Sequence, residues 1–207
     1  MTTDGTGRGF HFIGERLCVD FVNTEVIAGG HRVNLLGNFD DLAAWCAAAQ
    51  LVSPAQASDM TRQRTNAPEV ERTFTEALQF RATLRGMIER LAQGRQTVPQ
   101  AALDSINDVL RMRAGDLRVV RTKTGYETRY RPVFNEPAHL LVPIARSAAD
   151  LLSTGDLTLV RKCQNPQCIL YFYDTTKNHA RRWCSMSGCG NRAKAAAHYR
   201  RTRQPAS

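Results

Sequence analysis

Residues 161–203 read RKCQNPQCILYFYDTTKNHARRWCSMSGCGNRAKAAAHYRRTR, and four cysteines decide what this segment can fold into. Cys163 and Cys168 form one Cys-x4-Cys pair, and Cys184 and Cys189 form a second pair after an interval of fifteen residues. Each pair fits on one tight turn, so two facing turns offer four thiolates to one tetrahedral zinc ion. Two disulfides or four unrelated buried thiols are the alternatives. The paired spacing favours one structural zinc per chain, held by all four cysteines.

The net positive charge of the chain lies in the same segment. Residues 161–207 contain ten Lys or Arg residues and one acid, Asp174, whereas residues 1–160 contain eighteen residues of each sign. The formal net charge of +9 therefore comes from the last 47 residues. A patch of this sign and density attracts phosphate at long range and releases counterions on contact. A merely solubilising surface would mix the two signs. The tail is thus a candidate nucleic-acid binder.

Length and composition limit the rest of the molecule. With 207 residues, 43% of them hydrophobic, the chain can form one domain of ordinary size and a small appendage. We expect an α-rich domain over residues 10–155 and a zinc finger over residues 158–204. The sequence has no run of 18 apolar residues and no apolar N-terminal leader, so we expect a cytoplasmic protein without membrane contact. Clustered cysteines in a reducing compartment usually bind metal.

Apolar residues at helical spacing predict a helical N-terminal domain. The expected helices cover residues 15–24, 39–50, 68–93, 99–114 and 137–154. Residues 53–66 are polar and fit either a short helix or a loop, and Gly29, Gly30 and Gly37 mark loops.

Strands are expected in four places. Residues 117–123 and 126–132 form a hairpin that turns at Thr124-Gly125. A strand over 156–162 leads to Cys163, and a strand over 169–174 leaves Cys168. The fold class is therefore mainly α (α+β), with a helical N-terminal domain and a small β-hairpin. A small four-cysteine zinc finger and a basic helix from Ser187 onward complete the chain.

The tail resembles a known zinc-finger family. Cys189-Gly190-Asn191-Arg192 matches the motif that names the CGNR zinc finger, and Arg181-Arg182-Trp183-Cys184 and Ala193-Lys194 also fit that family. Thr176 stands where the family pattern has serine. Further upstream, residues 17–24, LCVDFVNT, resemble the N-terminal signature of the ABATE-type domain that precedes this finger in the same family.

The resemblance implies a bacterial transcription regulator that binds double-stranded DNA and whose N-terminal domain senses a ligand. Seven cationic side chains are the candidates for nucleic-acid binding: Arg181, Arg182, Arg192, Lys194, Arg200, Arg201 and Arg203. Arg192 follows a metal ligand directly and is equally suited to hydrogen bonding around the metal loop. Trp183 is expected to shield the metal. Asp174 is expected to bond backbone donors in its turn or to pair with Arg182 or Arg192.

Other functions remain possible on the sequence alone. A basic zinc finger also suits an RNA-binding or ribosome-associated protein, or an adaptor in which the finger is purely structural. Asp20, Asn23 and His31 are candidates for a small-molecule effector pocket. We do not expect an enzyme, because no spacing of nucleophile and base and no phosphate-binding loop is present. The apolar helices over 68–93 and 137–153 suggest a homodimer through the N-terminal domain.

Overall fold

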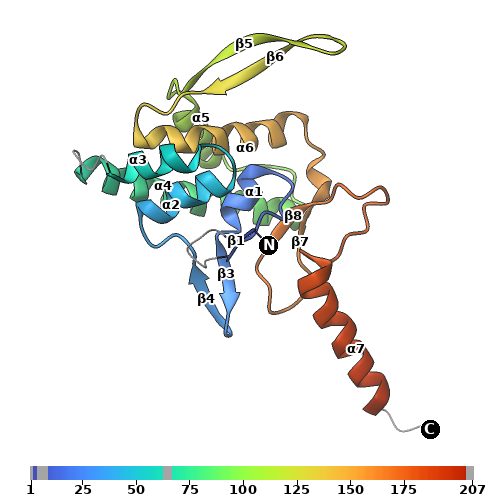
Figure 1. The fold of residues 1–207 in the computed structure, drawn as a ribbon. Coiled ribbons are helices and arrows are strands. Elements are labelled where there is room, and N and C mark those ends of the chain that lie inside the picture. Colours follow the sequence, from blue (N-terminus) through green and yellow to red (C-terminus); the bar gives the residue numbers. More distant parts are fainter. Residues whose placement is uncertain (1, 4–8, 63–66, 204–207) are drawn as a thin grey trace.

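The computed structural model describes residues 2–3, 9–62 and 67–203. Helices form a central body, from which a β-hairpin and the C-terminal helix project at opposite ends (Figure 1). Among the described residues, no helix has both the length and the apolar character needed to cross a membrane. The mainly helical fold class predicted from the sequence is confirmed.

The short helix α1 (Leu17–Val22) lies at the centre of the body and is almost entirely buried. Asp20 turns back to accept a hydrogen bond from the backbone N–H of Gly14 at 2.7 Å. A Cβ at Gly14 would lie 2.8 Å from Val19 Cγ1 and 2.9 Å from the Asp20 backbone nitrogen, so only glycine fits there. The loop before α1 is therefore closed tightly against the helix. A two-residue bridge of β1 (Thr2–Thr3) and β2 (Gly9–Phe10) precedes it.

The remaining helices of the body pack around α1. They are α2 (Phe39–Ala48), α3 (Pro54–Arg62), α4 (Ala67–Ala92), α5 (Gln100–Leu110), the 3-10 turn η2 (Pro137–Leu141) and α6 (Val142–Thr154). Asn38 caps α2, because its side chain accepts from the Asp41 N–H. The described part of residues 53–66 is helix α3. The expected helix over 137–154 is confirmed, with its first turn wound as 3-10.

One hairpin was missed from the sequence. Strands β3 (Glu25–Ala28) and β4 (His31–Asn34) pair antiparallel around Gly29 and Gly30, which we took to mark a loop. Both glycines have positive φ, +58° and +84°, which is the requirement of a type I′ two-residue turn. A Gly-Gly pair between short apolar stretches was the available signal.

A second hairpin was predicted and is present. Strands β5 (Gly115–Thr122) and β6 (Gly125–Pro132) pair along their whole length. Because Thr122 pairs with Gly125, the turn is made by Lys123 and Thr124, one residue earlier than predicted. The hairpin stands above α5 and α6 (Figure 1).

The segment that leads into the cysteines packs into the body. After the turn η3 (Leu157–Leu159), strands β7 (Val160–Lys162) and β8 (Tyr171–Tyr173) pair antiparallel. Val160, Tyr171 and Tyr173 belong to the same buried apolar cluster as the helices of the body. The main core therefore continues past the linker that separates the two predicted domains.

Candidate metal centre and basic surface

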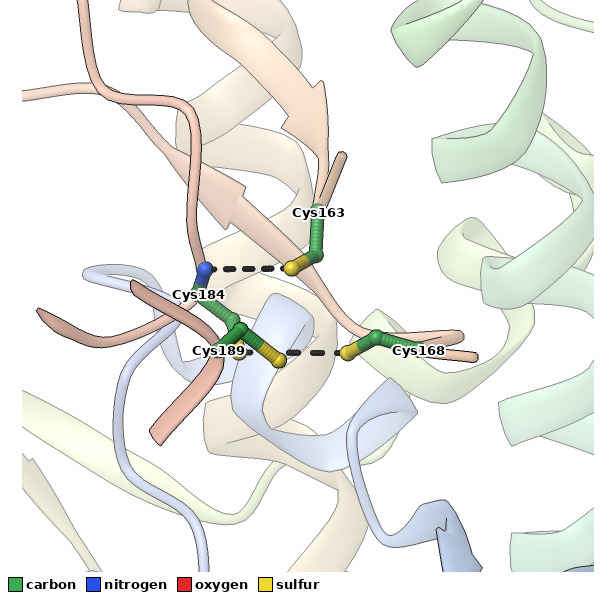
Figure 2. Close-up of side chains that lie close together, drawn as sticks. All are labelled: Cys163, Cys168, Cys184 and Cys189. Carbon is green, nitrogen blue, oxygen red and sulfur yellow. Dashed lines mark hydrogen bonds between the residues drawn. The ribbon is translucent and has the colours of Figure 1, made fainter. Parts of the chain in front are cut away.

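Two chain turns bring the four cysteines together. Cys163 directly follows β7 and Cys168 precedes β8, while Cys189 lies in a π-helical turn, η4 (Met186–Gly190). A Cβ at Gly190 would lie 2.8 Å from the sulfur of Met186, a contact that this exposed, flexible side chain could relieve by moving. The four side chains point toward one another (Figure 2). All four are buried, beside an apolar wall that includes Val26, Leu170 and Phe172.

The spacing of the sulfur atoms fits a single zinc ion. The four Sγ atoms lie within 4.8 Å of one another, and Sγ of Cys168 and Sγ of Cys184 are 3.8 Å apart (Figure 2). Tetrahedral zinc with Zn–S bonds of about 2.3 Å separates its sulfur ligands by about 3.8 Å. Four thiolates complete the coordination shell, so the bound zinc is structural and leaves no position for a substrate.

The four thiols lie so close together that the ionisation of each depends on the others. Hydrogen bonds from Cys168 and Cys184 lower the pKa of Cys163, so its sulfur is the one that carries the negative charge most readily. Donation to Cys163 raises the pKa of Cys168 to about 12 and also raises the pKa of Cys184. A divalent cation removes this conflict, because it favours the thiolate at every position.

Hydrogen-bond donors surround the sulfur atoms. The Cys184 N–H donates to Cys163 Sγ at 3.4 Å (Figure 2). Asn165 Nδ2 and Arg192 Nη2 donate to Cys189 Sγ at 3.2 and 3.0 Å. Such donors orient ligating thiolates and stabilise their charge. Arg192 therefore hydrogen-bonds in the metal loop, which is one of the two roles that the sequence left open for it. The residue is nevertheless exposed to solvent.

Asp174 organises the loop between the cysteine pairs. Its carboxylate accepts from the hydroxyl and N–H of Thr176 and from the Arg181 N–H. Burial opposes its negative charge, but these hydrogen bonds outweigh that effect and lower the pKa of Asp174. The expectation that Asp174 bonds backbone donors in its own turn is thus met. The threonine hydroxyl takes the place of serine without loss of the bond.

Arg181 is used inside the protein, contrary to our expectation of a phosphate contact. Its guanidinium donates to the carbonyl oxygens of Ile13, Trp183 and Cys184, and it lies 4.3 Å above the ring centroid of Phe172. It also pairs with Glu15 at 3.3 Å, and its side chain is only 16% exposed. We therefore assign it to holding the cysteine loop against the residues before α1.

Asn23 joins the body to the finger. Its amide donates to the Tyr171 carbonyl at 2.9 Å and accepts from the Tyr171 N–H at 3.0 Å, and the residue is fully buried. Asp20 is also buried and holds Gly14. His31 is exposed in the β3–β4 hairpin. The effector pocket expected around these three side chains is not supported, because two of them hydrogen-bond within the chain and the third faces solvent.

Five of the other candidate cations are exposed. They are Arg182, Arg192, Lys194, Arg200 and Arg201. Arg182 donates to Gln164 Oε1 and lies 5.2 Å from the Trp183 ring centroid. Helix α7 (Asn191–Arg203) carries the last four, and residues 198–202 are all exposed. The helix extends away from the body (Figure 1). The side chain of Arg203 lies outside the described residues.

A shallow groove of about 280 Å³ runs between α7 and the first cysteine turn. Trp183, Arg192 and Arg200 line it together with Asn165, Pro166 and Gln167. Trp183 also packs, partly buried, against the cluster that contains the cysteines, which fits its expected shielding role. The groove thus combines cations, side-chain amides and one aromatic ring beside an exposed basic helix.

Sequence reasoning missed a buried cluster of arginines. Arg81 and Arg85 of α4 both pair with Glu25 of β3, at 3.4 and 2.9 Å. Arg81 also donates to Thr24 and Asn34, and Arg85 donates to the Val22 carbonyl at 2.6 Å. The position of Arg81 on the apolar stripe of α4 was the available signal. These bonds fix the β3–β4 hairpin to the body, next to the metal centre.

The fold and the site define a protein with a helical body and a structural zinc finger. Residues 15–155 match the family ABATE, described as "putative stress-induced transcription regulator", and residues 160–202 match the CGNR zinc finger. The chain belongs to the ABATE family, as the resemblance of its sequence indicated. No match was found among curated proteins. A regulator and a zinc finger are both non-enzymatic kinds of protein.

Proposed function

We propose that the protein is a transcription regulator that binds double-stranded DNA through the finger and α7. The observation that carries this proposal is the placement of α7, whose exposed cations stand clear of the body next to a metal-fixed loop. Its residues 195, 196 and 198–202 are exposed, so a nucleic acid can approach the helix without rearrangement of the body.

The cations would act mainly on phosphates. Four of them, Arg182, Lys194, Arg200 and Arg201, are exposed. Among the described residues, none of the four forms a salt bridge with a carboxylate, and the side chain of Arg182 bonds only the neutral amide of Gln164. With Arg203, about five phosphate contacts give a slope of about −4 to −5 for log K against log[salt]. The small side chains of Ala195 and Ala196 allow close approach to a groove, where one arginine could read guanine. Binding chromosomal DNA would place the protein in the cytoplasm.

The ligand sensing that the sequence resemblance implied has no support at the three residues expected to form its pocket. Asp20 and Asn23 are committed to hydrogen bonds with Gly14 and Tyr171. The body would therefore act first as the support that fixes the finger. The proposal for DNA binding rests on the finger alone and does not require an effector.

The test is the salt dependence of binding to duplex DNA taken from the upstream region of the protein's own gene. Arg200→Ala with Arg201→Ala should reduce the magnitude of the slope by about two units and weaken binding, because two phosphate contacts are lost. Arg118→Ala with Arg129→Ala removes the same charge from the β5–β6 hairpin and serves as the matched control. It should leave the slope unchanged.

Two outcomes would contradict the proposal. Wild-type affinity and slope in the Arg200/Arg201 variant would show that this part of α7 is merely solvated, and would favour the adaptor. Equal affinity for structured RNA and for duplex DNA would favour the RNA-binding alternative. Zinc content, measured on every variant, confirms that the finger stays folded.

A further inference from the structure

The β5–β6 hairpin presents an apolar face to solvent. Side chains alternate along a strand and cross-strand partners share a face, so Leu117, Val119 and Arg121 lie with Tyr130, Thr128 and Tyr126. Leu117 is 67% exposed, Val119 73% and Tyr126 71%. An isolated two-stranded hairpin is marginally stable in water, and an exposed apolar strand invites association. This face therefore calls for a partner.

The root of the hairpin fixes its direction away from the body. Ala114 is buried, its carbonyl accepts from the Val133 N–H at 2.6 Å, and the Arg146 guanidinium lies 3.9 Å from the Tyr130 ring centroid. A Cβ at Gly115 would lie 2.3 Å from the Arg131 carbonyl oxygen, so the strands are in close contact there. The hairpin is held out from the body (Figure 1), so a second molecule can cover its apolar face.

The body carries a groove of matching chemistry. A groove of about 550 Å³ lies between α4 and α5 and beside η2. Phe80, Val109 and Leu141 form its almost fully buried floor, Met112 is partly exposed, and its acids are Glu76, Asp104 and Asp108. Glu76 has an arginine neighbour in Arg72, and Asp108 has one in Arg111. Asp104 accepts from the neutral amide of Gln100, so Asp104 is the acid best suited to receive a further cation.

We propose that the hairpin of one chain docks in the α4–α5 groove of a second copy, and that the exchange is reciprocal. Leu117, Val119 and Tyr126 would pack over this floor and against Met112. Arg121 on the same face and Lys123 at the exposed turn would meet the acids. The acids and cations are complementary in sign, which fixes the orientation of the arm.

The reciprocal arrangement closes a twofold dimer. The groove-forming helix α5 ends at Leu110, and the hairpin begins at Gly115, so the arm and the groove are neighbours in the same chain. In such an exchange both hairpins are docked and both grooves are filled. Docking in one direction only would instead leave a free hairpin and a free groove at the ends, and the chains would form open filaments. This inference goes beyond the proposed function and does not depend on DNA binding. It uses part of the interface expected from the sequence, because Glu76, Gln79, Phe80 and Thr83 of α4 and Leu141 line the groove, and it adds α5 and the hairpin.

The first test is the molar mass of the zinc-loaded full chain at about 100 μM, by light scattering. The expected result is twice the 23.1 kDa chain mass. Arg121→Glu should raise the dissociation constant at least tenfold, because it places a carboxylate against Asp104. Adding Asp104→Arg to that variant should restore the affinity to within about threefold of wild type. Val33→Thr, on the separate β3–β4 hairpin, is the control and should leave the dissociation constant of the dimer unchanged.

Three results would overturn the proposal. The wild-type chain could remain a monomer, it could form open higher oligomers, or the Arg121→Glu, Asp104→Arg chain could fail to regain affinity. Both substitutions lie at exposed or rim positions, and zinc content with circular dichroism verifies that each variant is folded.

A disulfide trap distinguishes the groove from contact between two hairpins. Val119→Cys with Ser105→Cys should give an interchain disulfide under mild oxidation of the zinc-loaded protein, while either substitution alone should give little. Efficient crosslinking of the single Val119→Cys chain would show that two hairpins meet face to face and would overturn docking in the groove.

Discussion

Two arms leave the body of this protein at opposite ends, and they are exposed for different reasons (Figure 1). Helix α7 presents cations and alanines, with Tyr199 as its large exposed apolar residue. The β5–β6 hairpin also carries arginines, but two of them pair locally with Asp116 and Glu127, and one face is apolar. Exposure of unbalanced charge suits a polyanion, whereas exposure of an apolar face suits another protein. Counting arginines alone would treat both arms alike.

The arms also differ in what holds them. Helix α7 follows the second cysteine pair directly, so its position depends on the metal and on the contacts of Arg181 and Asn23. The hairpin is held by backbone pairing, by the Ala114–Val133 hydrogen bond and by Arg146. Substitutions in the two regions should therefore have separable effects.

The largest effect is expected from Cys184→Ser, which removes one zinc ligand. Structural zinc supplies much of the folding free energy of a small finger, so we expect a loss of more than about 4 kcal/mol in unfolding free energy. DNA binding should disappear, and the hairpin should keep its hydrogen-exchange protection. Metal analysis and thermal unfolding measure this, with Cys46→Ala as a control that keeps its zinc. Stoichiometric zinc in the Cys184→Ser chain would contradict the four-cysteine site.

Asn23→Ala tests the link between body and finger. It leaves the N–H and C=O of Tyr171 buried without partners, so the free energy of unfolding should fall by about 3 kcal/mol. Urea denaturation measures the loss. Gln56→Ala, which loses a single exposed hydrogen bond from the Ser53 N–H, should cost less. An equal cost for both would mean that the bonds to Tyr171 contribute little to the attachment of the finger.

The pH dependence of stability should report on Asp20, which holds the loop against which Arg181 packs. Burial raises the pKa of Asp20 from 3.8 to about 6, so the folded state binds this proton more tightly. Its contribution is full below pH 4 and is lost as the pH rises through 6, by about 3 kcal/mol. Asp20→Asn should therefore gain stability relative to wild type between pH 4 and 6.5. Parallel stability curves for the two chains would refute this assignment.

The smallest effect is expected at the root of the hairpin. Arg146→Ala removes the cation above Tyr130 and should cost about 0.5–1 kcal/mol. Hydrogen exchange should be faster in β5 and β6 and unchanged in the finger. Arg90→Ala in α4 is a control at a distant position. A loss of protection in β7 and β8 would show that the two arms are coupled after all.

The parts of this structure that the sequence predicted are local in the chain. The cysteine spacing needs only two tight turns, and the helices of the body follow from apolar residues three and four apart. The matched families confirm the class of protein, and the sulfur geometry confirms the site. Thr122 and Gly125 show the limit of local reading, since the turn of the β5–β6 hairpin was misplaced by one residue.

The parts that were missed depend on residues far apart in the chain. Arg181 reaches the Ile13 carbonyl across 168 positions, and Asn23 reaches Tyr171 across 148. Nothing near Arg181 in the sequence distinguishes it from Arg182, which is exposed. A guanidinium is recruited by carbonyl groups that only the tertiary fold brings close, so charge counting overstated the number of free cations in the tail.

The seating of Tyr171 and Tyr173 in the body has a consequence for engineering chimaeras. A cut at the linker near Gly155 would separate β8 from Asn23 and would strip two aromatic rings of their packing partners. A finger grafted onto a foreign domain would therefore need a new apolar surface, and a new hydrogen-bond partner for Tyr171, to pack against β8. The same dependence restricts gene recombination. A crossover between residues 155 and 160 gives a folded protein only when β8 of the incoming tail packs against the helical body that receives it.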